Sequence, residues 1–176
     1  KLQAKNWLYQ MLSPTKIYEH SRYAYRQVER LVEGGCHLSF SDDFRDLPSR
    51  GVYIIFDHSE IRLDNQSTPR IVRVGTHQVA QNSSATLASR MRTHRGTNYG
   101  GGAHRSSVLR KYIGSAIARK DGWPLYSWGK QSNIDKSALQ YEATVEEVVS
   151  KYISSMTFAF LEISDPSGPM SDRAFV

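Results

Sequence analysis

The stretch Gly51-Val52-Tyr53-Ile54-Ile55-Phe56 decides the fold that this sequence predicts. It is short, apolar and rich in β-branched and aromatic residues, and it lies between Pro48 and the polar pair Asp57-His58. This pattern predicts a buried strand that begins at a glycine. A second run of this kind, from Arg70 to Gly75, also ends in a glycine. The polar linker between the two runs indicates that they form a hairpin with a long loop.

A helix is predicted next, over residues 85–95. Leu87 and Met91 are four positions apart and form its apolar stripe. Arg90 and His94 have the same spacing and lie immediately beside that stripe on the helix surface. The pair therefore either faces a site next to the two strands or is an ordinary surface pair.

The remaining patterns are mostly helical. Residues 1–35 carry basic side chains among aromatic ones, which suits base stacking and phosphate contacts but also describes an ordinary amphipathic helix with snorkelling cations. Further helices are predicted from about residue 104 and over residues 137–150, and a strand is predicted over residues 156–163. The expected fold is α+β, with a small three-stranded antiparallel sheet flanked by helices and an N-terminal helical extension.

The predicted organisation is an extension over residues 1–46 and a domain over residues 47–176, with a connector over residues 36–49 that spans the boundary between them. The chain has 176 residues and a net charge of +6, from 23 Lys and Arg against 17 Asp and Glu, which moderately favours polyanionic partners. The single Cys36 allows neither an internal disulfide nor a multi-cysteine zinc site, which fits a reducing, cytoplasmic setting. No apolar run approaches the length that crosses a bilayer.

A strand with a tyrosine, a strand that ends in glycine and a helix with Arg90 and His94 follow one another in the order found in the GIY-YIG nuclease family. The chain resembles this family from about Arg50 to Ile163. The resemblance implies an endonuclease that hydrolyses phosphodiester bonds in DNA with a divalent metal, typically magnesium. It implies that Tyr53 is the general base, that Arg90 contacts the phosphate and that His94 matches a histidine one turn after that arginine.

Two features depart from the family pattern. The second motif normally has a tyrosine where this chain has Arg73, which would hold the phosphate or place positive charge beside Tyr53 but would not itself be a base. A literal Tyr112-Ile113-Gly114 occurs later, but it lies in a predicted helix after the Arg/His helix, so we do not take it as the second motif. A buried arginine in a strand wants an anion, so we include Arg73 among the catalytic candidates.

The metal-binding glutamate of the family has no clear counterpart. In the family it lies on the helix after the third strand, so here it is expected just beyond Val176, in a domain cut short at its C-terminus. Glu142 and Glu146 share a helix face, but they precede that strand and match poorly. The metal ligands are therefore left unassigned.

Additional nucleic-acid contacts are expected near the core motif. Glycines 100–102 precede a predicted helix start, where backbone amides and the helix dipole favour an anion, although a flexible loop explains the same pattern. The candidate contacts are His77, Arg92, Arg95, His104 and Arg105. Two other functions stay open: a nucleic-acid-binding module that kept the fold and lost catalysis, and a protein-interaction subunit that uses the basic N-terminal helices.

Overall fold

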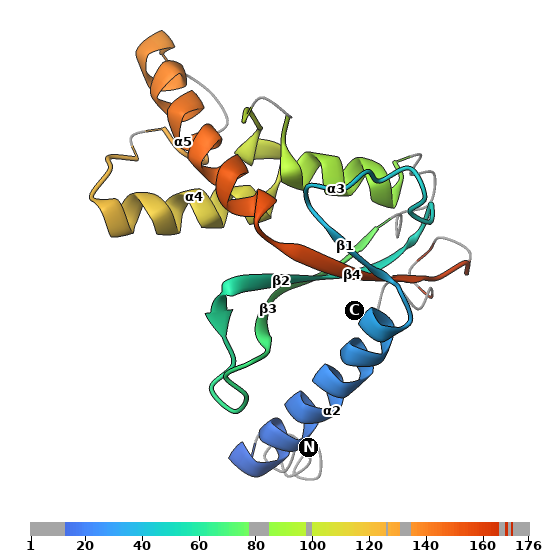
Figure 1. The fold of residues 1–176 in the computed structure, drawn as a ribbon. Helices are drawn as coiled ribbons and strands as arrows, with labels where there is room; N and C mark the ends of the chain where they lie inside the picture. Colours follow the sequence, from blue (N-terminus) through green and yellow to red (C-terminus); the bar gives the residue numbers. More distant parts are fainter. Residues whose placement is uncertain are drawn as a thin grey trace, which may run out of the picture. The chain divides into compact units, whose positions relative to one another are not determined.

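The computed structural model describes residues 13–77, 85–97, 100–125, 127–130, 135–165, 168 and 170. Their elements, in chain order, are α2 (Pro14–Glu33), β1 (His37–Ser39), β2 (Gly51–Ile61), β3 (Pro69–His77), α3 (Leu87–Arg95), the 3-10 helix η1 (His104–Ser106), α4 (Val108–Asp121), α5 (Lys136–Ser154) and β4 (Thr157–Glu162) (Figure 1). The chain divides into two compact units, the first up to His37 and the second from Leu38.

The first unit contains helix α2. Pro14 is the first residue of the helix, where a proline lacks no needed N–H and already has a helical φ. The Ser13 side chain caps this end by accepting a hydrogen bond from the Lys16 amide, and Gly34 follows the last turn as predicted. The first half of the predicted N-terminal helical pattern, residues 1–12, lies outside the described residues.

The second unit is built on a four-stranded sheet in the order β1-β4-β2-β3. Strand β2 pairs antiparallel with both β3 and β4, so the predicted hairpin and the predicted third strand are both present. The fourth strand, β1, lies within the segment predicted as a connector. It is only three residues long, which is too short for alternation to mark it in a sequence.

The register of the β2–β3 hairpin places the predicted residues of the two motifs side by side. Tyr53 is directly opposite Gly75, and Ile55 is directly opposite Arg73. The next pair is Phe56 with Ile71, so the ladder is shifted by one residue and Val72 is the extra residue of a bulge. Bulges of this kind turn neighbouring side chains to new directions and are common beside functional sites.

The core of the second unit forms where helices pack against the sheet. Tyr53 and Ile55 alternate with residues of the other sheet face, and they pack with Leu87 and Met91, the apolar stripe predicted for α3. All four are at most 1% exposed. In Figure 1, α3, α4 and α5 lie on the same side of the strands. The predicted α+β fold is therefore confirmed, with one more strand than expected. Of the helices in the described part of the chain, none has the length and apolarity needed to cross a membrane.

Candidate active site

Helix α3 brings the predicted arginine and histidine to the sheet. Its N-terminus is a capping box in which the Thr86 hydroxyl accepts from the Ser89 amide and the Ser89 hydroxyl accepts from the Thr86 amide. The helix ends at Gly96, whose φ of 86° lies in the region that favours glycine. His94 is in the last turn and is completely buried.

Three of the predicted catalytic side chains meet at the hydroxyl of Tyr53. The Nε2 atom of His94 lies 3.0 Å from Tyr53 Oη, and Nε of Arg73 donates to the same oxygen at 3.3 Å. The Tyr53 ring is 1% exposed, and Arg73 is half-buried. Two strands and one helix thus place a phenol, a guanidinium group and an imidazole around one oxygen atom.

The glycine of the second motif makes room for the Tyr53 ring. A Cβ atom added at Gly75 would lie 2.4 Å from both Cζ and Oη of Tyr53, well inside van der Waals contact. Gly75 is directly across the ladder from Tyr53, so its missing side chain leaves the space that the phenol occupies. The glycine is therefore required by the position of the tyrosine, and this is a physical reason for the glycine at the end of the second strand.

Ser107 fixes the other side of the His94 ring. Its Oγ atom lies 2.7 Å from His94 Nδ1 and also accepts the backbone N–H of Arg110, as the N-cap of α4. Ser107 is fully buried, so its hydroxyl proton needs an acceptor, and Nδ1 of His94 is the one within reach. The proton of the neutral imidazole is then on Nε2, and His94 donates to Tyr53 Oη.

The charge state of His94 supports this arrangement. Burial, as the largest cause, together with the positive charges of Arg90, Arg73 and Arg110 and with His77, lowers the pKa of His94 to about 3. His94 is therefore neutral at physiological pH and has one N–H to donate. Tyr53 Oη receives two hydrogen bonds, one from His94 and one from the cationic Arg73, which both favour negative charge on that oxygen.

Arg90 and His77 lie at the edge of this cluster. Arg90 donates to the Ser106 carbonyl at 3.2 Å and is close enough to lower the pKa of both His77 and His94. Burial is the main cause that lowers the pKa of His77, and a hydrogen bond to the Ala85 backbone opposes it. Nε2 of His77 is buried and has no hydrogen-bond partner among the described residues, so it has bonding capacity left for a ligand.

A second cluster, behind His94, is a buried ionic network around Arg110. The Arg110 side chain is fully buried, and its Nε donates to Glu146 Oε2 at 2.8 Å. Its Nη1 donates to the carbonyls of His94 and Arg95 at 3.1 and 2.9 Å. These carbonyls are unsatisfied ends of helix α3, so Arg110 holds the last turn in place. A Cβ atom at Gly102 would lie 2.1 Å from the Arg110 Cζ, so this glycine of the predicted phosphate loop accommodates the guanidinium instead.

The network also takes up His104, which the sequence analysis placed at the nucleic acid. His104 is 2% exposed and is stacked on Trp128, with ring centroids 3.8 Å apart. Its Nδ1 lies 2.9 Å from Glu146 Oε1, and its Nε2 accepts the Gly129 amide at 3.0 Å. Both ring nitrogens have protein partners, so neither is left for a ligand. Burial alone raises the pKa of Glu146, but the hydrogen bonds from His104 and Arg110 outweigh it and lower that pKa.

Arg105, another predicted nucleic-acid contact, is paired in the same way. Its two terminal nitrogens each donate to one oxygen of Glu142 at 2.8 Å, and its Nε donates to the Lys130 carbonyl. Burial raises the pKa of Glu142, whereas the bonds from Arg105 and Ser127 lower it by more. The guanidinium is committed to a bidentate ion pair.

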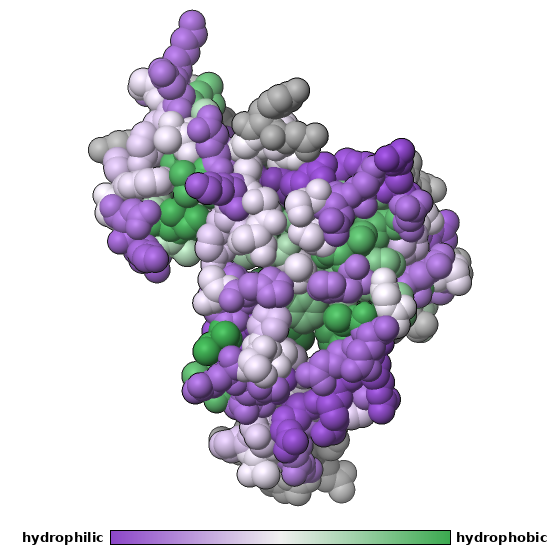
Figure 2. All heavy atoms as spheres, viewed as in Figure 1, coloured by the Kyte–Doolittle hydropathy of each residue, from purple (hydrophilic) through white to green (hydrophobic). Residues whose placement is uncertain are grey.

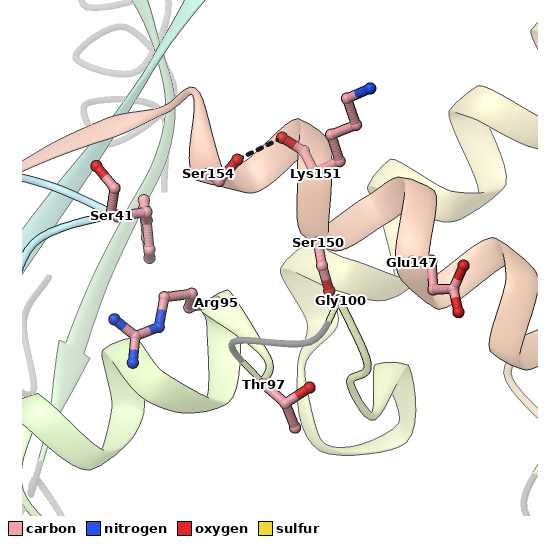
Figure 3. Close-up of a pocket in the computed structure, with 9 residues that line it drawn as sticks. Ser41, Arg95, Thr97, Gly100, Glu147, Ser150, Lys151 and Ser154 are labelled. Carbon is pink, nitrogen blue, oxygen red and sulfur yellow. Dashed lines mark hydrogen bonds between the residues drawn. The ribbon is translucent and has the colours of Figure 1, made fainter.

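The other two predicted contacts, Arg92 and Arg95, lie elsewhere on α3. Arg92 is exposed. Arg95 packs over the Phe44 ring, with Cζ 4.7 Å from its centroid, and its Nε is buried without a hydrogen-bond partner among the described residues. It lines a cavity of about 280 Å³. Figure 3 shows its side chain leaving α3 on the side of Ser41. Arg95 therefore belongs to a different surface from the Tyr53 cluster.

The metal-ligating side chains of the described residues are dispersed or paired with arginines. Nowhere in the described ranges do three or more His, Cys, Asp or Glu side chains gather in a way that would hold a metal ion. Glu142 and Glu146, which the sequence analysis also judged a poor match, are occupied by Arg105 and Arg110. The described residues thus do not by themselves fit a divalent metal, and no chemical step is assigned to one.

The protein is thus an α+β domain in which a strand tyrosine, a strand arginine and a helix histidine meet in one hydrogen-bonded cluster. A family model described as the GIY-YIG domain matches residues 16–176, so the chain belongs to the GIY-YIG family. That family is one of nuclease-type proteins, which act on nucleic acids and generally use divalent metals. Searches of curated proteins and of solved structures returned no match.

Proposed function

We propose that this protein is a magnesium-dependent endonuclease that hydrolyses phosphodiester bonds in DNA. The observation that supports it best concerns two cations, Arg73 and Arg90. Neither has a carboxylate partner in the described part of the chain, although Arg105 and Arg110 nearby are both paired with glutamates. Half-buried arginines without a carboxylate are suited to bind an anion that arrives with the substrate.

In the proposed reaction Tyr53 is the general base. The two donors on Oη, His94 Nε2–H and Arg73 Nε–H, stabilise the phenolate that takes a proton from the attacking water. Because the ring is 1% exposed, this transfer takes place away from bulk solvent, where both hydrogen bonds act most strongly. The water oxygen then bonds to phosphorus as the bond from phosphorus to the leaving oxygen breaks. The leaving oxygen takes a proton from solvent, and Tyr53 releases the proton that it accepted, which restores the phenolate.

Arg73 and Arg90 bind the phosphoryl oxygens, on which charge grows in the transition state. We propose His77 as a further contact to the phosphate or the attacking water, which its buried Nε2 atom, unpartnered among the described residues, supports. Arg92 adds a sequence-independent contact on the exposed side of α3, where the surface is mainly hydrophilic (Figure 2). His104 and Arg105 are left out of this interface because their donors are bonded within the protein. We propose magnesium as the divalent metal because it is the usual ion of phosphodiester hydrolysis. We also propose that the protein is cytoplasmic.

The test is nicking of supercoiled plasmid DNA by the purified protein with added Mg²⁺, with EDTA as the metal-free arm. Wild type should nick with Mg²⁺ and not with EDTA. Arg90→Ala should lose about 10²- to 10³-fold in rate, the usual cost of removing one transition-state donor. Binding of DNA that falls with salt, without cleavage by any divalent metal, would show a binding module of the same fold and contradict the enzyme.

A further inference from the structure

Next to the Tyr53 cluster is a second cavity, of about 250 Å³, that the proposed chemistry does not use. It opens between the β2–β3 hairpin and helix α4, and Tyr152 of α5 also lines it. Arg73 connects the two places, because its side chain lines the cavity while its Nε donates to Tyr53 Oη. A ligand in the cavity would therefore contact Arg73, which is hydrogen-bonded to Tyr53, the proposed base.

The two walls of this cavity differ in chemistry. The helical wall is apolar, with Leu109, Ile113 and Ala116 of α4 spaced so that they share one helix face. Tyr112, which is 67% exposed, adds an aromatic ring to that wall. The Tyr-Ile-Gly triplet at 112–114, set aside above as a motif, thus supplies two residues of the cavity wall.

The strand wall carries Val72 and Arg73 together with two carboxylates, Asp57 and Glu60. Glu60 is paired with Arg70 at 2.9 Å, so among the described residues Asp57 is the carboxylate without a cationic partner in this wall. Asp57 is 4% exposed, accepts from the Ser59 amide and hydroxyl at 2.9 and 2.7 Å, and accepts from the Tyr152 hydroxyl at 2.5 Å. Burial, with the nearby Asp57 carboxylate, raises the pKa of Tyr152, so this hydroxyl stays a donor that holds the carboxylate in place. Asp57 is thus a fixed hydrogen-bond acceptor at the cavity edge.

We infer that this cavity binds a single nucleobase with an exocyclic amino group, taken from the nucleotide next to the cleaved phosphate. An apolar wall with an aromatic ring suits the flat face of a base, and a carboxylate suits an amino group on its edge. The Asp57 carboxylate repels a phosphate at its own side of the cavity, whereas Arg73 attracts one, so the backbone lies at Arg73 and the base beside Asp57. The volume is at the lower end of small-molecule sites and fits one base rather than a larger ligand.

This inference rests on the proposed function, but free nucleosides test it separately because they carry no phosphate. Nucleosides are titrated into the protein while the methyl NMR signals of Ile113, Met156 and Val72 are followed. Adenosine, cytidine and guanosine should shift these signals saturably with weak affinity, on the order of millimolar, since one base brings few atoms. Thymidine should bind less tightly, because its edge places carbonyl oxygens where the amino group is required.

The decisive variant is Ala116→Trp, which fills the cavity from an exposed position on α4 without changing charge. Its matched control is Ala143→Trp, an exposed alanine of α5 that does not line the cavity. Nucleoside shifts should disappear in the first variant and persist in the second. Shifts that survive Ala116→Trp, or no shifts with any nucleoside up to its solubility limit, would overturn the inference.

A second readout uses the substrate. Duplexes with a single abasic site are scanned across the cleavage position, and one position should reduce wild-type affinity about tenfold, the scale of one lost base contact. Ala116→Trp should be insensitive to that position. If wild type cleaves but shows neither effect, the base site is wrong and the nuclease stands. If nucleosides bind at these methyl groups and no nucleic acid is cut, the proposed function fails instead.

Discussion

Two clusters of arginine and histidine meet at Ser107, and they differ in whether the arginine has a carboxylate partner. Around Arg110, the cation is fully buried and bonded to Glu146, and His104 is bonded on both ring nitrogens. Around Tyr53, Arg73 donates to a neutral phenol and lacks a carboxylate partner among the described residues. The first cluster pairs its cation within the protein, whereas in the proposed function the second pairs its cation with a phosphate of the substrate. The difference indicates which of two similar groups of residues is built for the fold and which for a substrate.

The largest effect should come from breaking the Arg110 cluster. Arg110→Met leaves Glu146 buried without its cation and should lower the free energy of unfolding by about 3–5 kcal/mol. Arg90→Met, at the edge of the Tyr53 cluster, should change it by less than about 1 kcal/mol. Urea unfolding of both variants measures the contrast, and equal losses would mean that the two clusters do not differ as described.

The next effect concerns the space that Tyr53 needs. Gly75→Ala places a methyl group 2.4 Å from the Tyr53 hydroxyl, so the phenol must move away from His94 and Arg73. A displacement of about 1 Å in a catalytic group costs roughly 10²-fold in rate, and the cleavage assay should show that loss. Gly168→Ala is the control, because a Cβ atom there meets nothing within 4 Å. Full activity of Gly75→Ala would show that the position of Tyr53 is not critical.

The neutral state of His94 predicts an acid-sensitive fold. The pKa of His94 is about 3 in the folded protein, against 6.5 for a free histidine. Between these values the unfolded chain binds a proton that the folded chain does not, so stability falls as pH drops below about 6.5. From about pH 7 to about pH 4.5 this linkage amounts to about 2.5 kcal/mol.

His94→Gln removes the titrating group and should remove that part of the pH dependence. Urea unfolding of wild type and variant at both pH values gives the comparison. The carboxylates of the Arg110 cluster also titrate in acid, but they are common to both proteins and cancel in the difference. Identical pH dependence in the two proteins would contradict a neutral, buried His94.

The smallest effect should come from Ser107, the residue shared by both clusters. Ser107→Ala removes the cap of α4 and the bond to His94 Nδ1, and it should cost about 1–2 kcal/mol of stability. Because the serine also sets the proton position on His94, cleavage should slow beyond what the stability loss explains. Ser107→Thr keeps the hydroxyl and should restore most of the rate. A Ser107→Ala variant that cuts at the wild-type rate would contradict the claim that Ser107 sets the proton position on His94.

Much of the fold was predictable because its signals are local. The β-rich runs at residues 51–56 and 70–75, which are bounded by glycine and polar residues, and the stripe of Leu87 and Met91 each predict one element from a few neighbouring residues. The four-residue spacing of Arg90 and His94 likewise placed both near the strands. The short edge strand β1 was missed because three residues carry no periodic signal.

The partners of the charged residues were harder to predict, because pairing across the fold leaves no local mark. His104 and Arg105 follow glycines before a helix and therefore resemble a phosphate contact in sequence. Their carboxylate partners are 42 and 37 positions away, on α5. Ser107 was also missed, although a serine before an apolar helix is the ordinary signal of an N-cap.

The most direct test of the central claim is the single-turnover cleavage rate of Tyr53→Phe, which keeps the ring and removes one oxygen atom. The rate should fall by at least about 10²-fold, while DNA affinity stays close to wild type and the protein remains folded with a loss of about 1–3 kcal/mol of stability for the unpaired donors. Tyr23→Phe, at a tyrosine of α2 that is 59% exposed, is the control and should cut normally. A Tyr53→Phe protein that cleaves at the wild-type rate would contradict the claim that this hydroxyl activates the attacking water.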